Sequence, residues 1–467
     1  MTNPIALSAT FLQNATQAQM PVTSTRDLRG AVIDSRAVTP ECLFCALSGN
    51  HTDGIRFCKD ALSRGAAGIL VSHMPNDLPH DLSYSVFVVD DVRISLGKLA
   101  SAVRLSVLPK VIAITGSVGK TTTKELIARV LSTTYETHKN QGNLNNDLGL
   151  PLTVLSMPEH CAVLVTEAGM SHAKELAYLS NLVRPDIAVI TNIGTAHIGN
   201  LGSREAIAEA KLEILQGLTP NGIALYDGDE PLLQTISGGI PVGFSERCAY
   251  RILEVHYTTD PTPCTEFLLQ TPYAVIENLR VCSIGTHFAQ DAAFAFAIGE
   301  LLSVPEETIR MALFSALQTP LRGRQNRMIQ NGICIIDDGY NASPESMCAA
   351  LASLQMEPIQ KGARKICVLG SMLELGELSP LLHRQVGQKA TFCDFLITYG
   401  TQAEAIADGA REAGMPSANI RSFSEADTTD ALVHLCQTLL RPGDILLCKG
   451  SHAMGLSEFT AQLQNVL

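Results

Sequence analysis

The clearest pattern in this chain is a series of short, continuous apolar runs, each followed by a stretch with helical spacing. In the middle of the chain the runs are Val111–Ile114, Cys161–Val165 and Ile187–Ile190. Strands buried on both faces are continuously apolar, whereas strands with one solvated face alternate between apolar and polar residues. The pattern therefore predicts a parallel sheet covered by helices on both faces.

Both flanking parts of the chain repeat this alternation. The first part holds a helical stretch, Ile55–Arg64, and apolar runs at Ala66–Val71 and Val86–Val89. The last part holds four predicted strands: Ile333–Ile336, Lys365–Leu369, Phe395–Tyr399 and Ile445–Cys448. We therefore predict an α/β fold of three domains, because a chain of 467 residues is too long for one core. They are a small N-terminal α/β domain (residues 1–108), a central parallel-sheet domain (residues 109–320) and a C-terminal Rossmann-like domain (residues 321–467).

Composition narrows the classes of partner. The formal net charge is -12, Trp is absent and aromatic residues make up 5%, which argues against nucleic-acid binding.

Residues 1–20 carry no Lys or Arg and no apolar run is long enough to span a bilayer, so we expect a cytoplasmic protein. Cys42 and Cys45 have CxxC spacing, but no second pair completes a zinc site. The 13 cysteines are therefore interpreted as thiols, mostly buried.

A glycine-rich turn connects the strand ending at Ile114 to a helix. Glycines let successive N–H groups point at phosphate oxygens, and a helix N-terminus adds its positive dipole. Lys120 is placed to reach the β- and γ-phosphates, and the Thr121 hydroxyl to bind Mg²⁺. The strict phosphate-loop pattern has a glycine where this chain has Ile114, so we predict a shortened variant, with an ordinary turn as the alternative. The predicted phosphate contacts are Gly116, Ser117, Val118, Gly119, Lys120, Thr121 and Thr122.

An acid and a histidine follow the next two predicted strands. Glu167 comes directly after Cys161–Val165, and His197 comes soon after Ile187–Ile190. Residues just beyond the carboxyl ends of parallel strands line the ligand crevice, so both are expected near the phosphate loop. Glutamate is a hard oxygen ligand suited to Mg²⁺, whereas a histidine here is also compatible with an ordinary hydrogen-bonded loop residue.

Lys211 lies on the apolar stripe of a predicted helix that begins after Ser203. It is four residues after Ile207 and three before Ile214, and this spacing places all three on one face. A lysine that points inward needs a partner or a lowered pKa, unless its ammonium extends past its apolar stem to solvent. The pattern leaves these alternatives open.

These residues resemble a known family, the Mur ligases. The resemblance is carried by Glu167-Ala-Gly-Met, by the segment from Ile187 to His197 and by Ala210-Lys-Leu-Glu-Ile. Three further segments are similar to the branch that adds D-alanyl-D-alanine: Asn143 to Leu155, Asp338-Gly-Tyr-Asn-Ala-Ser-Pro and Leu369-Gly-Ser-Met-Leu-Glu-Leu-Gly. The resemblance covers nearly the whole chain, in order, and is weakest in the first 108 residues.

The resemblance implies an ATP-dependent ligase of peptidoglycan precursor synthesis. In that branch the carboxylate of a UDP-N-acetylmuramoyl-tripeptide takes the γ-phosphoryl group of ATP, and the amine of D-alanyl-D-alanine attacks the resulting acyl phosphate. Domain closure is expected to exclude water from that intermediate. The expected ligands are ATP and two Mg²⁺ ions, the expected partners are the two substrates, and the expected state is a monomer.

The resemblance also implies roles for single residues. The expected catalytic residues are Lys120, Glu167, His197 and Lys211, and the expected metal ligands are Thr121, Glu167, His197 and a carbamate on Lys211. A carbamate would explain an inward lysine, because CO₂ capture turns a cation into an anionic oxygen ligand. The expected nucleotide contacts beyond the loop are Asp291, Arg324, Asp338 and Asn341. The expected contacts to the UDP-linked substrate are Ser35, Arg36, Asn143 and Asn146.

The chain departs from the family pattern at a few positions. Asp291 stands where an asparagine is common, Ser371 replaces an aspartate, His452 replaces an arginine, and Gly199-Asn200 stands where Glu-Gly is common. None of these lies in the phosphate loop or among the expected metal ligands. Three alternatives remain. The first is another ligase of the same superfamily, such as a different Mur ligase or a folylpolyglutamate synthase. The second is a binding protein that senses a nucleotide, and the third is a degenerate scaffold.

Overall fold

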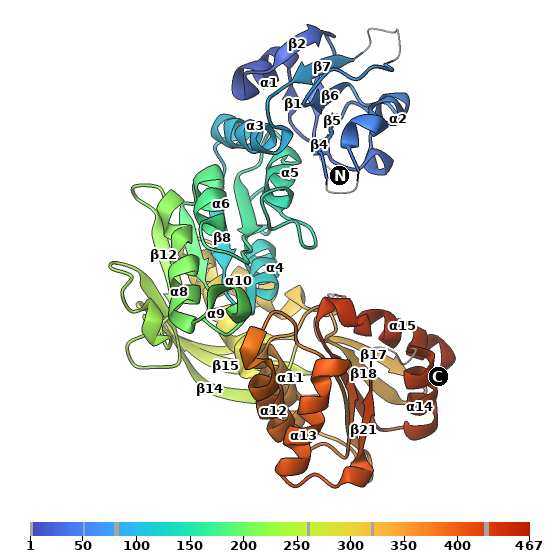
Figure 1. Ribbon diagram of the computed structural model, residues 1–467. Coiled ribbons are helices and arrows are strands. Elements are labelled where there is room, and N and C mark those ends of the chain that lie inside the picture. Colours follow the sequence, from blue (N-terminus) through green and yellow to red (C-terminus); the bar gives the residue numbers. More distant parts are fainter. Residues whose placement is uncertain (1–2, 50–51, 79–83, 259–261, 319–321, 425–428) are drawn as a thin grey trace. The chain divides into compact units, whose positions relative to one another are not determined.

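The computed structural model describes residues 3–49, 52–78, 84–258, 262–318, 322–424 and 429–467. Figure 1 draws them as a ribbon with its helices and strands labelled. They form two compact units. The first unit comprises Met1–Thr115, Leu131–Val189 and Ala210–Ala224, and the second comprises Gly116–Val130, Ile190–Glu209 and Leu225–Leu467. The α/β class is confirmed. The boundaries of the three domains stay a prediction, and the one between residues 320 and 321 lies outside the described residues.

The N-terminal part is built on a five-stranded sheet in the order β2-β7-β6-β5-β4. Its strands are β2 (Gln19–Val22), β4 (Ala31–Val32), β5 (Leu43–Cys45), β6 (Gly68–Val71) and β7 (Ser85–Val88). A two-stranded sheet pairs β1 (Ala6–Leu7) with β3 (Leu28–Arg29). The helices are α1 (Ala9–Thr16), α2 (Cys58–Ser63) and α3 (Val92–Val107). The predicted helix Ile55–Arg64 begins as a 3₁₀ turn, Gly54–Phe57, and continues as α2.

The second sheet has nine strands in the order β16-β15-β14-β13-β12-β11-β8-β10-β9. They are β8 (Lys110–Thr115), β9 (Thr137–Lys139), β10 (Val163–Glu167), β11 (Ile187–Ile190), β12 (Ile223–Asp227), β13 (Ile240–Gly243), β14 (Tyr250–Thr258), β15 (Cys264–Gln270) and β16 (Val275–Val281). β10 pairs in parallel with β8, as predicted, and also with β9, a strand that was not predicted. The antiparallel hairpins of β14, β15 and β16 were not predicted. These strands alternate between buried and exposed positions, so they lack a continuous apolar run.

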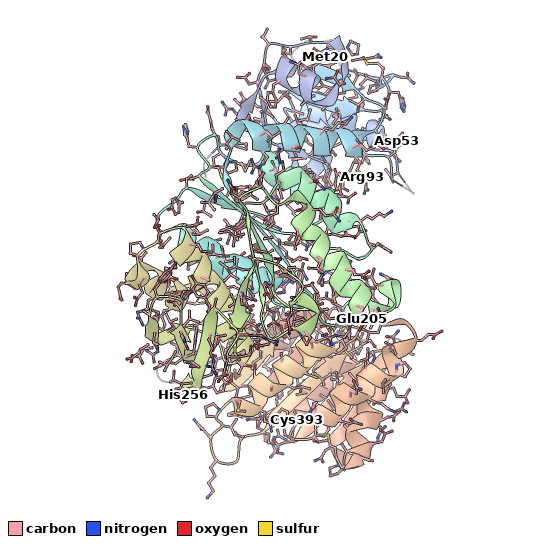
Figure 2. The ribbon with its side chains drawn as sticks, turned by 90° about the vertical axis from the view of Figure 1, so that its left-hand side faces the viewer. Met20, Asp53, Arg93, Glu205, His256 and Cys393 are labelled. Carbon is pink, nitrogen blue, oxygen red and sulfur yellow. The ribbon has the colours of Figure 1, made fainter. Side chains whose placement is uncertain are left out.

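Seven helices accompany this sheet in the described part of the chain. They are α4 (Lys120–Leu131), α5 (Gly149–Leu155), α6 (Glu175–Val183), α7 (Ile198–Leu201), α8 (Arg204–Leu212), α9 (Thr286–Leu301) and α10 (Glu306–Ala316). In the first unit, Arg93 at the start of α3 (Figure 2) forms an ion pair with Asp147, just ahead of α5. This pair ties the last helix of the N-terminal part to the segment that leads into α5.

The C-terminal sheet has six strands in the order β17-β18-β22-β19-β20-β21. They are β17 (Asn326–Gln330), β18 (Ile333–Asp337), β19 (Lys365–Gly370), β20 (Phe395–Tyr399), β21 (Ile420–Phe423) and β22 (Ile445–Lys449). The helices are α11 (Pro344–Met356), α12 (Ser379–Lys389), α13 (Glu404–Glu412), α14 (Thr429–Leu439) and α15 (Leu456–Val466). Among the described strands of this sheet, β17 alone is antiparallel to its neighbour, so the parallel sheet of the predicted Rossmann-like domain is present.

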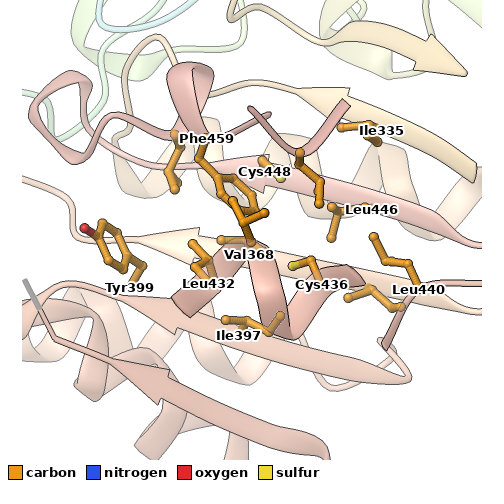
Figure 3. Packing of buried hydrophobic residues seen from close by; sticks show 14 of the residues in the cluster. Ile335, Val368, Ile397, Tyr399, Leu432, Cys436, Leu440, Leu446, Cys448 and Phe459 are labelled. Carbon is orange, nitrogen blue, oxygen red and sulfur yellow. The ribbon is translucent and has the colours of Figure 1, made fainter. Parts of the chain in front are cut away.

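Apolar side chains from the sheet and from α14 and α15 form the core of this C-terminal part (Figure 3). Val368 and Leu446 on the sheet pack with Leu432 of α14 and Phe459 of α15, and all four are fully buried. The continuous apolar runs seen in the sequence are therefore the strands that supply this core.

The structure bears on two features that the sequence argued against, a cysteine zinc site and a membrane-spanning helix. The 13 cysteines are free thiols and most are buried, including Cys42 and Cys45. Burial raises the pKa of the Cys42 and Cys45 thiols, which disfavours the thiolate that zinc requires. Among the helices of the described residues, none combines the length and hydropathy needed to cross a membrane.

Candidate functional site

The predicted phosphate loop connects β8 to α4. Two of its glycines are required by close packing. A Cβ at Gly116 would lie 1.9 Å from Thr191 Oγ1, and a Cβ at Gly119, where φ is +83°, would lie 2.8 Å from Asp291 Oδ1. Only glycine fits where the backbone lies this close to a neighbouring side chain. The strand, turn and helix expected from the sequence are therefore all present.

Asn192, which follows β11, holds the first half of the loop. Its Oδ1 accepts from the N–H groups of Ser117 (3.1 Å) and Val118 (3.0 Å), and its Nδ2 donates to the Val118 carbonyl (3.1 Å). Thr191 Oγ1 donates to the same carbonyl at 2.6 Å. The amides of Ser117 and Val118 are thus engaged within the protein, and the residues at the start of α4 are left as the stronger phosphate candidates. Sequence reasoning missed Asn192, because its partner lies 74 residues away in the chain.

Lys120 stands at the first position of α4. Its Nζ donates to the carbonyl of Gly116 at 2.8 Å and to the carbonyl of Ser117 at 3.3 Å. These contacts keep the ammonium over the concave side of the loop, where a nucleotide phosphate is expected. Thr121 follows with a side chain that is mostly buried. This placement fits the predicted roles of both residues.

Asp291 lies on α9 against the underside of the loop. Its Oδ1 accepts from Thr123 Oγ1 at 2.8 Å. Burial raises the pKa of Asp291 to about 7, although the Thr123 hydrogen bond and the positive charge of Arg324 oppose the shift. The carboxyl thus supports the phosphate loop through Gly119 and Thr123. The predicted nucleotide contact at Asp291 stays a prediction.

The C-terminal segment brings Arg324 into this neighbourhood. Its guanidinium lies 4.3 Å from the ring centroid of Tyr340 in a cation–π contact. Asp338 forms a buried ion pair with Lys449, whose Nζ lies 2.7 Å from Oδ2 and also donates to the Asn341 carbonyl at 3.1 Å. Asp338 and Asn341 are therefore held in one turn by Lys449, a residue to which the sequence analysis gave no role. Their predicted contact with a nucleotide stays a prediction.

Glu167 ends β10 and is buried. In the sheet it pairs with Ile114, the residue that leads into the phosphate loop. Asn145 Nδ2 donates to its Oε1 at 2.9 Å, and Asn140 Oδ1 accepts from its backbone N–H at 2.9 Å. Two asparagines of one segment thus fix Glu167: Asn145 orients its carboxylate, and Asn140 holds its backbone. Neither was predicted, because side-chain hydrogen bonds to Glu167 leave no local pattern.

Lys211 is buried at the end of α8 with a relative exposure of 2%. The predicted cap is present, since Ser203 Oγ accepts from the Ala206 N–H at 3.1 Å. Ile207 and Ile214 are also buried, so the predicted inward stripe is confirmed. Burial of the whole lysine argues against an ammonium that reaches solvent. A group able to neutralise or stabilise the charge is required here.

His197 directly precedes α7 and has a left-handed backbone, φ 63°. Its Nδ1 contacts the carboxylate of Glu374 in the C-terminal segment. The histidine lies in the second unit, whereas Glu167 and Lys211 lie in the first. Its role as a metal ligand stays a prediction.

The predicted contacts to a UDP-linked substrate lie in two loops of the first unit. Asp34 caps a 3₁₀ turn by accepting from the Arg36 N–H at 2.9 Å, and the Arg36 side chain is exposed. Ser35 is buried and hydrogen-bonds Asp60. Asn146 Oδ1 accepts from the N–H of Gly149, the first residue of α5, at 2.8 Å, and Asn143 is exposed. Arg36, Asn143 and Asn146 are therefore exposed, although Arg36 pairs with Asp34 and Asn146 bonds the Gly149 N–H, whereas Ser35 is buried.

The residues present can be compared with the ligands that Mg²⁺ prefers. Among the described residues, no group of three His, Cys, Asp or Glu side chains converges as a ready-made metal site. Magnesium commonly uses one or two protein oxygens together with substrate phosphates and water. The Thr121 hydroxyl and the oriented Glu167 carboxylate are each an oxygen ligand of the kind that this mode uses. A metal site that they share stays a prediction.

Replacing Asp291 with asparagine tests the buried carboxyl by its effect on stability. Because the native pKa is raised from 3.8 to about 7, the folded state binds more protons than the unfolded state between those values. Stability is thus lost as pH rises through that window. We expect Asp291→Asn to stabilise the protein by up to about 4 kcal/mol at pH 8, and by less at pH 5, in thermal melts.

Asp229→Asn is the control of opposite sign. Burial raises its pKa, but hydrogen bonds from Phe244 and Ser245 outweigh burial and hold the pKa below 3.8. That carboxylate contributes stability above its unfolded pKa, so its loss should destabilise at pH 8. An Asp291→Asn gain that is the same at both pH values would contradict a raised pKa.

Comparison with known proteins identifies the family. Residues 114–299 match the Mur ligase middle domain, and residues 323–452 match the Mur ligase, glutamate ligase domain. The UDP-N-acetylmuramoyl-tripeptide–D-alanyl-D-alanine ligase of Bacillus subtilis (strain 168) is 37% identical over 441 residues, covering 93% of each chain. The crystal structure of MurF from Acinetobacter baumannii superimposes with a TM-score of 0.86 at 30% identity, covering 99% of each chain.

A second solved structure agrees with this assignment. The MurF ligase from Thermotoga maritima, in complex with ADP, gives a TM-score of 0.79 at 26% identity and covers 93% of this chain and 97% of its own. The similarity is thus nearly full-length in sequence and in fold. The chain belongs to the Mur ligase family, in the branch of the UDP-N-acetylmuramoyl-tripeptide–D-alanyl-D-alanine ligases, as its sequence motifs predicted.

Proposed function

We propose that this protein joins D-alanyl-D-alanine to UDP-N-acetylmuramoyl-tripeptide with consumption of ATP, as a monomer in the cytoplasm. The observation that carries the proposal is the 37% identity over 93% of the chain to a relative with that ligase name. The phosphate loop, the oriented Glu167 and the buried Lys211 support it. Such a loop can bind the phosphates of ATP, a carboxylate can bind Mg²⁺, and Lys211 matches the lysine that the family carries as a carbamate.

The reaction follows from the chemistry of a carboxylate, which is a poor electrophile. A terminal carboxylate oxygen of the tripeptide attacks the γ-phosphorus of ATP, the bond to the β-phosphate oxygen breaks, and ADP leaves. The amine of D-alanyl-D-alanine attacks the acyl carbon, phosphate leaves with the former carboxylate oxygen, and the amine loses a proton. The product is an amide.

The residues of this chain have separable roles in the proposal. Lys120 and the N–H groups at the start of α4 bind and orient the phosphates. Thr121, Glu167, His197 and a carbamate on Lys211 would hold two Mg²⁺ ions, which when bound neutralise charge on the transferring phosphoryl group. Arg324, Asp338 and Asn341 are proposed to meet the nucleotide from the C-terminal side. Ser35, Arg36, Asn143 and Asn146 are proposed to face the UDP-linked substrate.

Phosphate release from ATP by the purified protein tests the proposal. UDP-N-acetylmuramoyl-tripeptide is supplied with D-alanyl-D-alanine, with a single amino acid, or alone. We expect rapid release only with the dipeptide, together with a pentapeptide product by mass. Release with another amine would indicate a sister ligase, and ATP binding without release under any pairing would indicate a sensor or scaffold.

A further inference from the structure

Residues 191–199, which follow β11 and are called here the 191–199 loop, contact the phosphate loop on one side. Thr191 and Asn192 hydrogen-bond the Val118 carbonyl, and the Gly194 N–H donates to Ser117 Oγ at 2.8 Å. The position of the phosphate loop therefore depends on the position of this segment.

On its other side, the 191–199 loop contacts two carboxylate residues of the C-terminal segment. Glu345, in the first turn of α11, accepts with one oxygen from both the Thr195 N–H (2.7 Å) and Thr195 Oγ1 (2.8 Å). Glu374 contacts His197 Nδ1 with its side chain, and its carbonyl accepts from the Gly199 N–H at 2.9 Å. The loop is thus held at Thr195, His197 and Gly199.

The environment of Glu345 shows that this contact is tight. A Cβ at Gly194 would lie 2.7 Å from the Glu345 carboxyl carbon. The second carboxylate oxygen, Oε2, is buried and has no hydrogen-bond partner among the residues that the structure describes. Burying an oxygen in this way opposes folding. Fold stability alone therefore does not explain a carboxylate at this position.

The backbone of the loop is consistent with restraint from its surroundings. His197 has φ 63°, a left-handed conformation that is uncommon for residues other than glycine. Such a conformation persists where neighbouring contacts fix it. Here Glu345 contacts Thr195, two residues before the histidine, and Glu374 contacts His197 itself.

We infer that Glu345 is a positioning residue for phosphoryl transfer, acting through Thr195 to set the 191–199 loop against the phosphate loop. The inference rests on the proposed function. In the part of the chain that the structure describes, the hydrogen bonds of Glu345 go to Thr195 and not to the phosphate loop, so its effect passes through the 191–199 loop. A C-terminal segment seated on this loop thereby sets the geometry at Ser117 and Val118.

Glu345→Ala tests the inference through the split between kcat and KM. We expect kcat to fall about tenfold, the effect of losing about 1.4 kcal/mol of transition-state stabilisation. The KM for D-alanyl-D-alanine should change less than about twofold, because no amine contact is removed. Glu345→Gln keeps an oxygen that can accept from Thr195, so it should retain most of the activity.

Glu404→Ala is the matched control. Glu404 also lies in the first turn of a helix in the C-terminal segment, and it is exposed. Its loss removes the same favourable charge at a helix N-terminus without any contact to the 191–199 loop. It should leave kcat unchanged, and a fall equal to that of Glu345→Ala would overturn the inference.

Hydrogen exchange supplies a readout that does not need turnover. In Glu345→Ala the amides of the 191–199 loop and of residues 116–119 should exchange faster than in the parent protein, whereas Glu404→Ala should match the parent. Unchanged exchange in both peptides would overturn the inference even in an active enzyme. A parent protein that makes no pentapeptide would refute the proposed function alone, because the exchange result still decides the role of Glu345.

Discussion

Lys120→Met is expected to lower kcat by about 10²- to 10³-fold, the range found when one preorganised charge-stabilising group is removed. The ammonium lies over the phosphate loop, held by the carbonyls of Gly116 and Ser117. Methionine keeps the length of the side chain but cannot offset charge on the transferring phosphoryl group. Steady-state phosphate release measures the loss.

The Lys120 variant needs a control for charge and for folding. Lys98→Met makes the same change at an exposed position on α3 and should leave activity unchanged. Thermal melts should show Lys120→Met folded, because its hydrogen bonds to the carbonyls of Gly116 and Ser117 lie within one loop. A Lys120→Met enzyme within tenfold of the parent would refute the role of this ammonium in phosphoryl transfer.

Lys211→Ala is expected to lower kcat by at least about 10²-fold, if Lys211 carries the carbamate that provides an anionic ligand. The carbamate forms when the neutral amine attacks CO₂ and releases one proton. Small carboxylates such as formate or acetate supply a similar anionic oxygen, so they should restore part of the activity. Phosphate release at increasing carboxylate concentration gives the measurement.

Lys211→Arg distinguishes a carbamate at Lys211 from a purely structural role of this lysine. Arginine keeps a positive charge in the buried site but does not form a carbamate, so this variant should also be inactive. Lys120→Met should gain nothing from the added carboxylate. An active Lys211→Arg enzyme, or an alanine variant that carboxylates do not rescue, would contradict the carbamate.

The parts of the fold that the sequence predicted share one physical origin. Strands such as β8, β11 and β20 are buried on both faces, so their apolar runs are visible in the chain itself. The inward position of Lys211 followed in the same way, from helical spacing relative to Ile207 and Ile214. The strands β14, β15 and β16 were missed because they expose part of their length and alternate.

The parts of the site that the sequence did not predict are polar contacts between distant segments. Asn145 orients Glu167, Asn192 holds the phosphate loop, and Lys449 pairs with Asp338. A single polar residue in a loop has no periodicity, and its partner is chosen by the tertiary fold. The phosphate loop itself was predictable because its glycines, lysine and threonine lie within a few adjacent residues.

The most direct test of the central claim follows the oxygen atoms of the tripeptide. UDP-N-acetylmuramoyl-tripeptide labelled with ¹⁸O in its terminal carboxylate is incubated with ATP, Mg²⁺ and D-alanyl-D-alanine, and the phosphate released is analysed by mass. An acyl-phosphate ligase predicts one ¹⁸O atom in the phosphate for each amide formed. Amide formation with unlabelled phosphate would contradict the acyl phosphate, and phosphate release without amide would contradict the ligase assignment.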